Sequence, residues 1–154
     1  MAVHGGCGLC VDERRGLVHT LARGSVVSWS VPAGEELGSI SVTGVVDLPA
    51  TGLCVHPTKL QVFVPGKAKS DEDPGVIFVF SLTTKRCLAT FAGHTRQVTH
   101  ILWVHGYGLL TAANDGTCRL WDSSGGSRIV YETGRSRTFL SEVQIDKIRG
   151  VAVS

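Results

Sequence analysis

Residues 93–122 read GHTRQVTHILWVHGYGLLTAANDGTCRLWD. Two short apolar runs flank the sequence Gly-Tyr-Gly at 106–108, and the pair Asp115-Gly116 lies between two further β-prone runs. An Asp-Gly pair between such runs is typical of a tight hairpin turn, because both central residues of that turn need positive φ. The stretch therefore predicts a three-stranded antiparallel meander. A fourth strand follows at 127–133, after the turn sequence Ser-Ser-Gly-Gly.

With Gly-His near its start, Asp-Gly in a turn and Trp-Asp at its end, the stretch resembles a WD repeat, the unit of the WD-repeat β-propellers. In that family four side chains of a well-formed repeat form one hydrogen-bonded network, and all four positions are filled here, by His94, Thr111, Asp115 and Trp121. A buried carboxylate is costly unless it is hydrogen-bonded, so the resemblance implies that His94 and Thr111 satisfy Asp115 while the Trp121 indole closes the far end. We interpret His94 and Asp115 as a structural pair rather than a catalytic one.

Two weaker copies precede this repeat, and the three align on the third-strand aromatic: Trp29, Phe80 and Trp121. Five residues before each aromatic stands a glycine, which we attribute to the turn: Gly24, Gly75 and Gly116. Eight residues after each stands an aliphatic residue, which we expect on the buried face of the fourth strand: Leu37, Leu88 and Ile129. Arg23 and Pro74 occupy the position of Asp115 in the first and second copies, so we expect packing alone to hold those copies.

The fold class predicted is all-β, a partial β-propeller of about three four-stranded antiparallel blades plus a strand of a fourth. The chain is then a single WD-repeat domain or a fragment of one over 1–154, with blades at about 5–42, 50–91 and 93–133. Residues 134–154 start a further blade or form a tail, with a strand at 148–153 or, alternatively, a short helix at 142–148. With 154 residues, 43% of them apolar, 18% charged and 19 glycines, the composition fits one globular domain with many turns.

The second copy is longer than the third. Trp29 and Phe80 are 51 residues apart and Phe80 and Trp121 only 41, against a usual period of about 40–45. The excess lies in the polar, proline-bounded insertion at 65–74. It reads either as a solvated loop or as a loop that contacts a partner, because long loops on rigid scaffolds often bind other molecules.

The resemblance implies a non-catalytic scaffold or adaptor that binds other proteins or peptides. The partner surface we predict combines the insertion with the segment after His94, and its residues are Lys67, Lys69, Asp71, Asp73 and Arg96. The alternative is a reader of anionic lipid or nucleic acid that uses Arg96, Arg119, Arg128, Arg135 and Arg137. A net charge of +2 does not by itself indicate a nucleic-acid partner, because binding to phosphates needs a clustered basic face. We therefore do not expect nucleic acid as the partner.

Catalytic and metal-binding motifs are weak or absent from the sequence. It has no phosphate-binding loop, no Gly-x-Ser-x-Gly elbow and no His-Glu-x-x-His, so we expect neither an enzyme nor a cofactor. His4, Cys7 and Cys10 have close spacing, but no second pair follows, and a strand would point the two cysteines to opposite faces; we therefore expect no metal. We interpret the remaining cysteines, at 54, 87 and 118, as small core residues.

Five cysteines and no apolar segment of signal-peptide length indicate an intracellular protein, cytoplasmic or nuclear, and no run is long enough to span a bilayer. Three blades would leave outer sheet faces exposed, so the ring needs further blades. A start at Met1 and an end inside an apparent strand favour closure by the remainder of a longer chain, with self-association as the second possibility.

Overall fold

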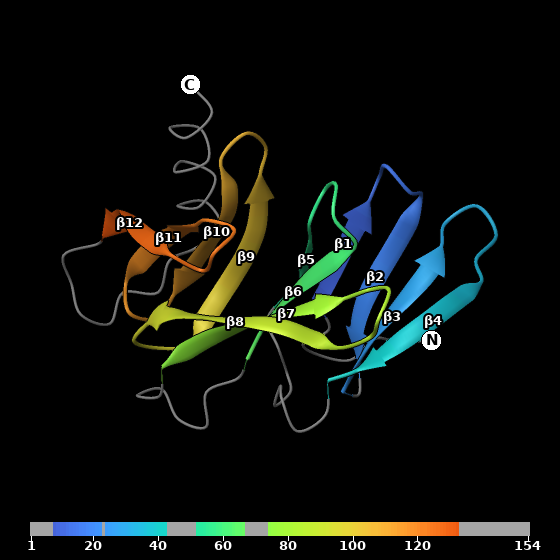
Figure 1. Ribbon diagram of the computed structural model, residues 1–154, viewed down its shortest axis with the longest axis horizontal. Coiled ribbons are helices and arrows are strands. Elements are labelled where there is room, and N and C mark those ends of the chain that lie inside the picture. Colours follow the sequence, from blue (N-terminus) through green and yellow to red (C-terminus); the bar gives the residue numbers. More distant parts are fainter. Residues whose placement is uncertain (1–7, 23, 43–51, 67–73, 133–154) are drawn as a thin grey trace.

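The computed structural model describes residues 8–22, 24–42, 52–66 and 74–132, which form three four-stranded sheets (Figure 1). Blade 1 consists of β1 (Gly8–Asp12), β2 (Leu17–Ala22), β3 (Ser25–Ser30) and β4 (Glu36–Ser41). Blade 2 consists of β5 (Cys54–Val55), β6 (Gln61–Pro65), β7 (Gly75–Ser81) and β8 (Cys87–His94). Blade 3 consists of β9 (Val98–Val104), β10 (Gly108–Ala113), β11 (Thr117–Trp121) and β12 (Ser127–Glu132).

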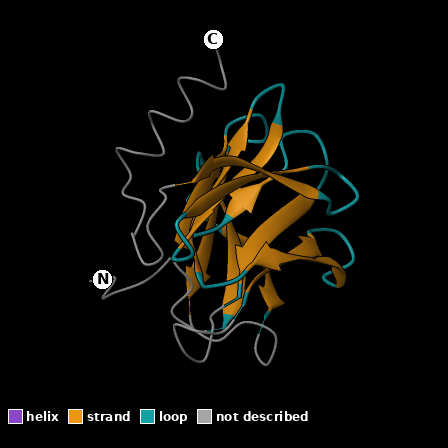
Figure 2. Ribbon diagram, turned by 90° about the vertical axis from the view of Figure 1, so that its left-hand side faces the viewer, coloured by secondary structure: helices purple, strands orange, loops and turns teal. Residues whose placement is uncertain are grey.

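Each sheet is an antiparallel meander in which strands adjacent in sequence are also adjacent in space. The first strands of the blades are neighbours, because β1 contacts β5 and β5 contacts β9, and the three sheets fan out from them (Figure 1). Outside the strands the described residues form loops and turns (Figure 2), and none of them forms a helix long and apolar enough to cross a membrane. This all-β, unclosed arrangement confirms the predicted partial propeller; the predicted strand or helix within 134–154 lies outside the described residues.

The core is divided between the two faces of blade 2. Side chains alternate along a strand, so Val62 and Val64 of β6 face blade 1, whereas Phe63 between them faces blade 3. The first face packs on a set from blade 1 that includes Leu21, Val26 and Ile40, and the second packs on Val98, Leu109 and Trp121 of blade 3. Blade 2 is therefore buried on both sides, as the middle layer of a stack must be.

Two of the three aligned glycines are explained by their turns, and the third is explained differently. Gly24 and Gly116 have φ of 76° and 78°, which a residue with a Cβ rarely adopts. Gly75 is not among the positive-φ residues; instead, a Cβ added there would clash with the carbonyl oxygen of Arg96 and lie 2.9 Å from the amide nitrogen of Val98. Attributing Gly75 to its turn was wrong, because the residue allows β7 to approach the segment that connects blades 2 and 3.

The aligned aliphatic residues lie outside the core, contrary to expectation. Leu37 is 58% exposed, Leu88 51% and Ile129 46%. A β-bulge interrupts the pairing of the fourth strand in every blade: Trp29 pairs with Glu36 and Ser28 with Gly38, so Leu37 is the extra residue, and Leu88 is the extra residue between Cys87 and Ala89. In blade 3 the extra residue is Val130, next to Ile129. A bulge re-aims the side chains around it, so strict alternation predicted the wrong face.

The first two blades have no aspartate at the position equivalent to Asp115, and different contacts replace the network in each of them. For the second repeat, Val42 directly after β4 of blade 1 and Val64 and Phe80 of blade 2 take the positions that His94, Thr111 and Trp121 have in the third repeat, and all three are buried in one apolar cluster. In blade 1, the indole nitrogen of Trp29 still donates to Thr20 Oγ1 at 3.0 Å. At these positions, packing alone holds blade 2, as expected. The same expectation was wrong for blade 1, because its Trp–Thr hydrogen bond is kept.

The prediction that the later cysteines are buried core residues was correct for two of the three. Cys54 and Cys118 are buried, as expected of core residues, whereas Cys87 is exposed beside the bulge of β8. Burial raises the pKa of the Cys54 and Cys118 thiols, each to about 12, so both stay protonated near neutral pH.

Candidate functional site

The structure brings His94, Thr111, Asp115 and Trp121 into one chain of hydrogen bonds. The Trp121 indole N–H donates to Thr111 Oγ1 at 2.7 Å, and that oxygen lies 2.7 Å from His94 Nε2. His94 Nδ1 in turn lies 2.9 Å from Asp115 Oδ2. With Nδ1 protonated, each group donates to the next one, from indole to hydroxyl to imidazole to carboxylate, so a neutral histidine satisfies the whole chain.

The carboxylate at the end of this chain is fully paired. Oδ2 accepts from His94 Nδ1 and from the amide of Thr95 at 3.0 Å, while Oδ1 accepts from the amide and the hydroxyl of Thr117 at 2.9 and 2.7 Å. The Asp115 side chain is only 6% exposed. Burial by itself would raise its pKa, but the hydrogen bonds from His94 and Thr117 outweigh burial and hold the pKa of this carboxyl well below its usual range.

The network joins two blades. His94 ends β8, the outer strand of blade 2, whereas Thr111 belongs to β10 and Trp121 to β11 of blade 3. Gly93 makes the junction possible, because a Cβ there would lie 3.1 Å from Cη2 of Trp121 and 3.2 Å from the Ser127 hydroxyl. The Gly-His pair of the sequence thus lets the indole lie against β8 while the imidazole reaches across to the carboxylate.

Thr95 and Thr117 belong to the network and were missed by sequence reasoning. Aspartate side chains in turns often accept from the backbone two residues on, so the sequence Asp-Gly-Thr carried a usable signal for Thr117. Thr95 gave no such signal, because its amide reaches Asp115 only once β8 and blade 3 are packed together.

The predicted partner-binding residues are only partly placed by the structure. Lys67, Lys69, Asp71 and Asp73 lie outside the described residues. Arg96 lies between β8 and β9, and its carbonyl oxygen contacts Gly75 at the end of the insertion. The base of the insertion is therefore beside Arg96 and next to the turn that carries Asp115.

The structure describes only part of the arginine set of the alternative hypothesis. Arg119 Nη1 donates to Ser127 Oγ at 3.1 Å, so this side chain is held against β12. Arg128 is on β12, and Arg135 and Arg137 lie outside the described residues. Of the possible zinc ligands, His4 and Cys7 also lie outside them, and burial raises the pKa of the Cys10 thiol to about 12. No group of three metal-ligand side chains occurs in the part of the chain that is described.

Comparisons with known proteins agree with this geometry. Residues 85–122 match the family model "WD domain, G-beta repeat". A probable inactive protein kinase of Dictyostelium discoideum is 29% identical over 118 residues, which cover 69% of this chain and 8% of that protein. The structure resembles the crystal structure of RRP9 WD40 repeats, with a TM-score of 0.64 and 18% identity, and that of U3-55K, with 0.63 and 18%. The matches cover 85% and 92% of this chain but only 39% and 42% of those structures.

Replacing Asp115 by alanine should destabilise the chain by about 1–3 kcal/mol or more, because His94 and Thr117 would keep buried polar groups without their partner. The matched control is Arg23→Ala, at the equivalent position of the first copy, which should change the free energy of unfolding far less. Urea unfolding of both variants measures the difference. Equal midpoints would remove the structural role we give to Asp115.

The contribution of Asp115 should also depend on pH in one direction. Its folded pKa lies below the ordinary 3.8, so as pH falls the unfolded chain takes up the proton first. The stabilisation is therefore complete near neutral pH and is lost from about pH 5 downward. Urea unfolding of the wild type and of Asp115→Asn should show the largest stability difference at neutral pH and a shrinking one in acid. A difference that stays constant down to about pH 3 would contradict this account.

Proposed function

We propose that this chain, whose residues 85–122 match the WD-repeat family model and whose fold resembles WD40-repeat structures, is a non-catalytic scaffold that binds other proteins through its loops. WD-repeat proteins generally serve as protein-interaction scaffolds. The fold alone does not specify a partner, so the proposal has to rest on a surface of this chain.

The surface proposed is the insertion rim, which we define as the insertion at 66–74 together with the turns at 95–97 and 114–116. The observation that carries the proposal is the way the two ends of the insertion and the two turns are fixed to one another. The Gly66 amide donates to the Val76 carbonyl at 2.7 Å, and Gly75 pairs with His94. The Asn114 amide donates to the Gln97 carbonyl at 2.9 Å, which ties the other two turns together.

A surface built in this way suits binding because backbone hydrogen bonds hold the turns that support it. Ordering a surface costs entropy on association, and the fixed turns at 95–97 and 114–116 avoid part of that cost. The insertion carries lysines and aspartates, Lys67, Lys69, Asp71 and Asp73, and Arg96 lies at its base. We propose that these residues make the polar contacts with the partner protein.

Deleting residues 67–73 should abolish capture of the partner from a cell lysate while the far-ultraviolet circular dichroism spectrum and the urea midpoint stay unchanged. The paired control is the double variant Glu13→Ala and Arg14→Ala, two exposed residues of the turn between β1 and β2, which should keep all binding. A deletion variant that retains every captured protein would leave the insertion as a solvated loop only.

We also propose that further blades complete the ring. The face of blade 1 that points away from blade 2 carries Leu9 and Val11, 62% and 56% exposed, beside the Thr20–Trp29 pair. In blade 3 the corresponding Thr–Trp pair is covered by β8 of its neighbour, which supplies His94. Blade 1 thus presents half of a network, and we propose that the outer strand of another blade covers it. The remainder of a longer chain is our preferred source, and a second copy is the alternative.

Sedimentation of the isolated 154-residue chain tests closure. The uncovered face should bind an apolar dye or drive self-association, because exposed apolar patches of this kind are rare on monomers. The matched control is Leu9→Lys with Val11→Lys, which should reduce both signals. A monodisperse monomer that binds no dye would contradict the proposal.

A further inference from the structure

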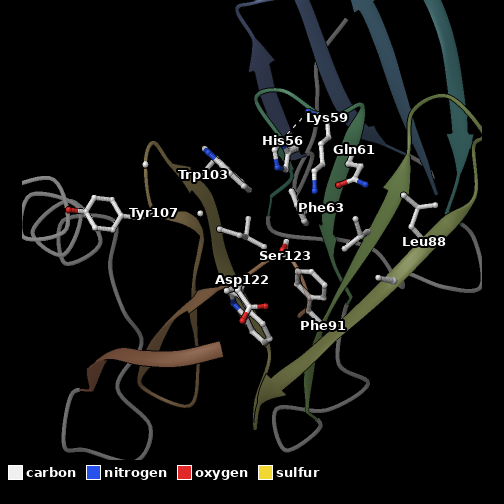
Figure 3. A pocket seen from close by; sticks show the side chains of 16 residues that line it. His56, Lys59, Gln61, Phe63, Leu88, Phe91, Trp103, Tyr107, Asp122 and Ser123 are labelled. Carbon is white, nitrogen blue, oxygen red and sulfur yellow. Dashed lines mark hydrogen bonds between the residues drawn. The ribbon is translucent and has the colours of Figure 1, made fainter. Parts of the chain in front are cut away.

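A cavity of about 460 Å³ opens between blades 2 and 3 at the end of the molecule opposite the insertion rim (Figure 3). Its walls include Gly108 and Trp121, which lie at the ends of β10 and β11 remote from the Asp115 turn, and Leu88 and Ala89 at the start of β8. This end carries none of the contacts proposed above. Its volume is within the range of small-ligand and side-chain pockets, about 300–1,000 Å³.

The cavity is lined by a row of aromatic rings from both blades. Ring centroids are 4.3 Å apart between His56 and Trp103, 6.0 Å between Trp103 and Phe63, 6.2 Å between Phe63 and Phe91, and 5.7 Å between Phe91 and Trp121. Trp121 cannot rotate freely, because its N–H is bonded to Thr111. The pocket is therefore apolar and already formed, which favours a large apolar side chain.

A fixed negative charge lies at the mouth of the cavity. Asp122 Oδ1 accepts from the amide and hydroxyl of Ser124 at 2.8 and 2.5 Å and from the amide of Gly126 at 3.0 Å. The hydrogen bonds from Ser124 lower the pKa of Asp122, so the exposed carboxyl is ionised near neutral pH. The side-chain ion pairs found among the described residues join Arg15 to Asp12 and His94 to Asp115, so in that part of the chain Asp122 has no cationic partner.

The hollow continues past Asp122. A second cavity of about 360 Å³ shares Tyr107, Trp121 and Asp122 with the first. We treat the two adjoining cavities as one groove; Lys59 lines the first cavity and Arg128 the second. An extended ligand fits this shape better than a compact one. Asp122 borders both cavities and has no cationic partner among the described residues, so it is the place for a positive group of the ligand.

We propose that this groove, which we call the interblade groove, binds an extended segment of a partner protein that has a large apolar side chain two residues away from an arginine or lysine. Alternate side chains of an extended chain point to the same side, so both groups face the groove together. The apolar side chain fills the aromatic cavity, and the cation pairs with Asp122. The inference rests on the proposed binding role and adds to it a second surface with a defined ligand.

The test uses a fluorescein-labelled, end-blocked peptide of sequence Gly-Ser-Phe-Ser-Arg-Ser-Gly and the full chain, with fluorescence anisotropy as the readout. Saturable binding should weaken at least about tenfold when the peptide phenylalanine is replaced by alanine or its arginine by glutamate. Absence of saturable binding up to about 1 mM, or equal binding of all three peptides, overturns the proposal.

Two variants of the chain locate the binding. Ala89→Trp fills the cavity from an exposed position of β8 and should abolish binding, whereas Ala92→Trp, also exposed and on the opposite face of the same strand, should leave it unchanged. Asp122→Asn keeps an oxygen for the bonds from Ser124 and Gly126 but removes the charge. It should weaken binding about tenfold and remove its dependence on salt. Wild-type affinity in Ala89→Trp or Asp122→Asn overturns the proposal.

The outcomes separate this inference from the function proposed above. Deletion of residues 67–73 should leave peptide binding intact, because the residues that flank this segment, Gly66 and Pro74, lie at the other end of the blades. If the deletion variant keeps all partners while the peptide binds as expected, the insertion rim is wrong and the interblade groove stands. If the peptide fails while the deletion abolishes capture, only the interblade groove is wrong.

Discussion

The structure depends on the need to satisfy one buried carboxylate. Asp115 is almost completely removed from water, and an ionised group in that position is tolerated only when its lone pairs are occupied. Four donors from His94, Thr95 and Thr117 occupy them, and two of these residues lie at the boundary between blades 2 and 3 rather than within blade 3. Satisfying the charge therefore requires the two sheets to dock in one register, and the same contact fixes the turn that supports the insertion.

Comparison of the blades shows that such a network must be complete or replaced as a whole. Losing one partner leaves a buried polar group unpaired, whereas replacing every partner by apolar groups of similar shape costs little. In the second repeat every polar partner is replaced by an apolar residue, with Val42, Val64 and Phe80 in place of histidine, threonine and tryptophan. This explains how a copy without the family's polar residues keeps the same sheet. It also explains why the insertion is tolerated next to Pro74, where no aspartate has to be held in place.

The sequence was sufficient to predict the fold and the four network residues, because turn chemistry and repeat spacing are local and the network positions lie within one repeat. It failed where the backbone departs from regular alternation. Leu37 and Leu88 are the extra residues of bulges, which change the face a side chain occupies without any sign in the residue pattern. The interblade groove could not be predicted either. Its walls are formed by rings that are distant in sequence, such as His56 in the loop after β5 and Trp103 of β9.

The two junctions between the blades differ in the contacts that hold them together. The junction of blades 2 and 3 has an apolar layer, a polar network that crosses it and a row of aromatic rings. The described junction of blades 1 and 2 has an apolar cluster, the buried His19–Ser28 hydrogen bond within blade 1 and one bond from Arg15 to the Thr58 carbonyl. In repeat proteins stability is approximately the sum of each repeat and its interfaces, so the pair formed by blades 2 and 3 should be the most cooperative part of the chain. Trp121 is central to that pair, since its N–H belongs to the network and its ring lines the interblade groove. One side chain thus connects the interaction that holds the blades together with the surface on which a partner segment is proposed to bind.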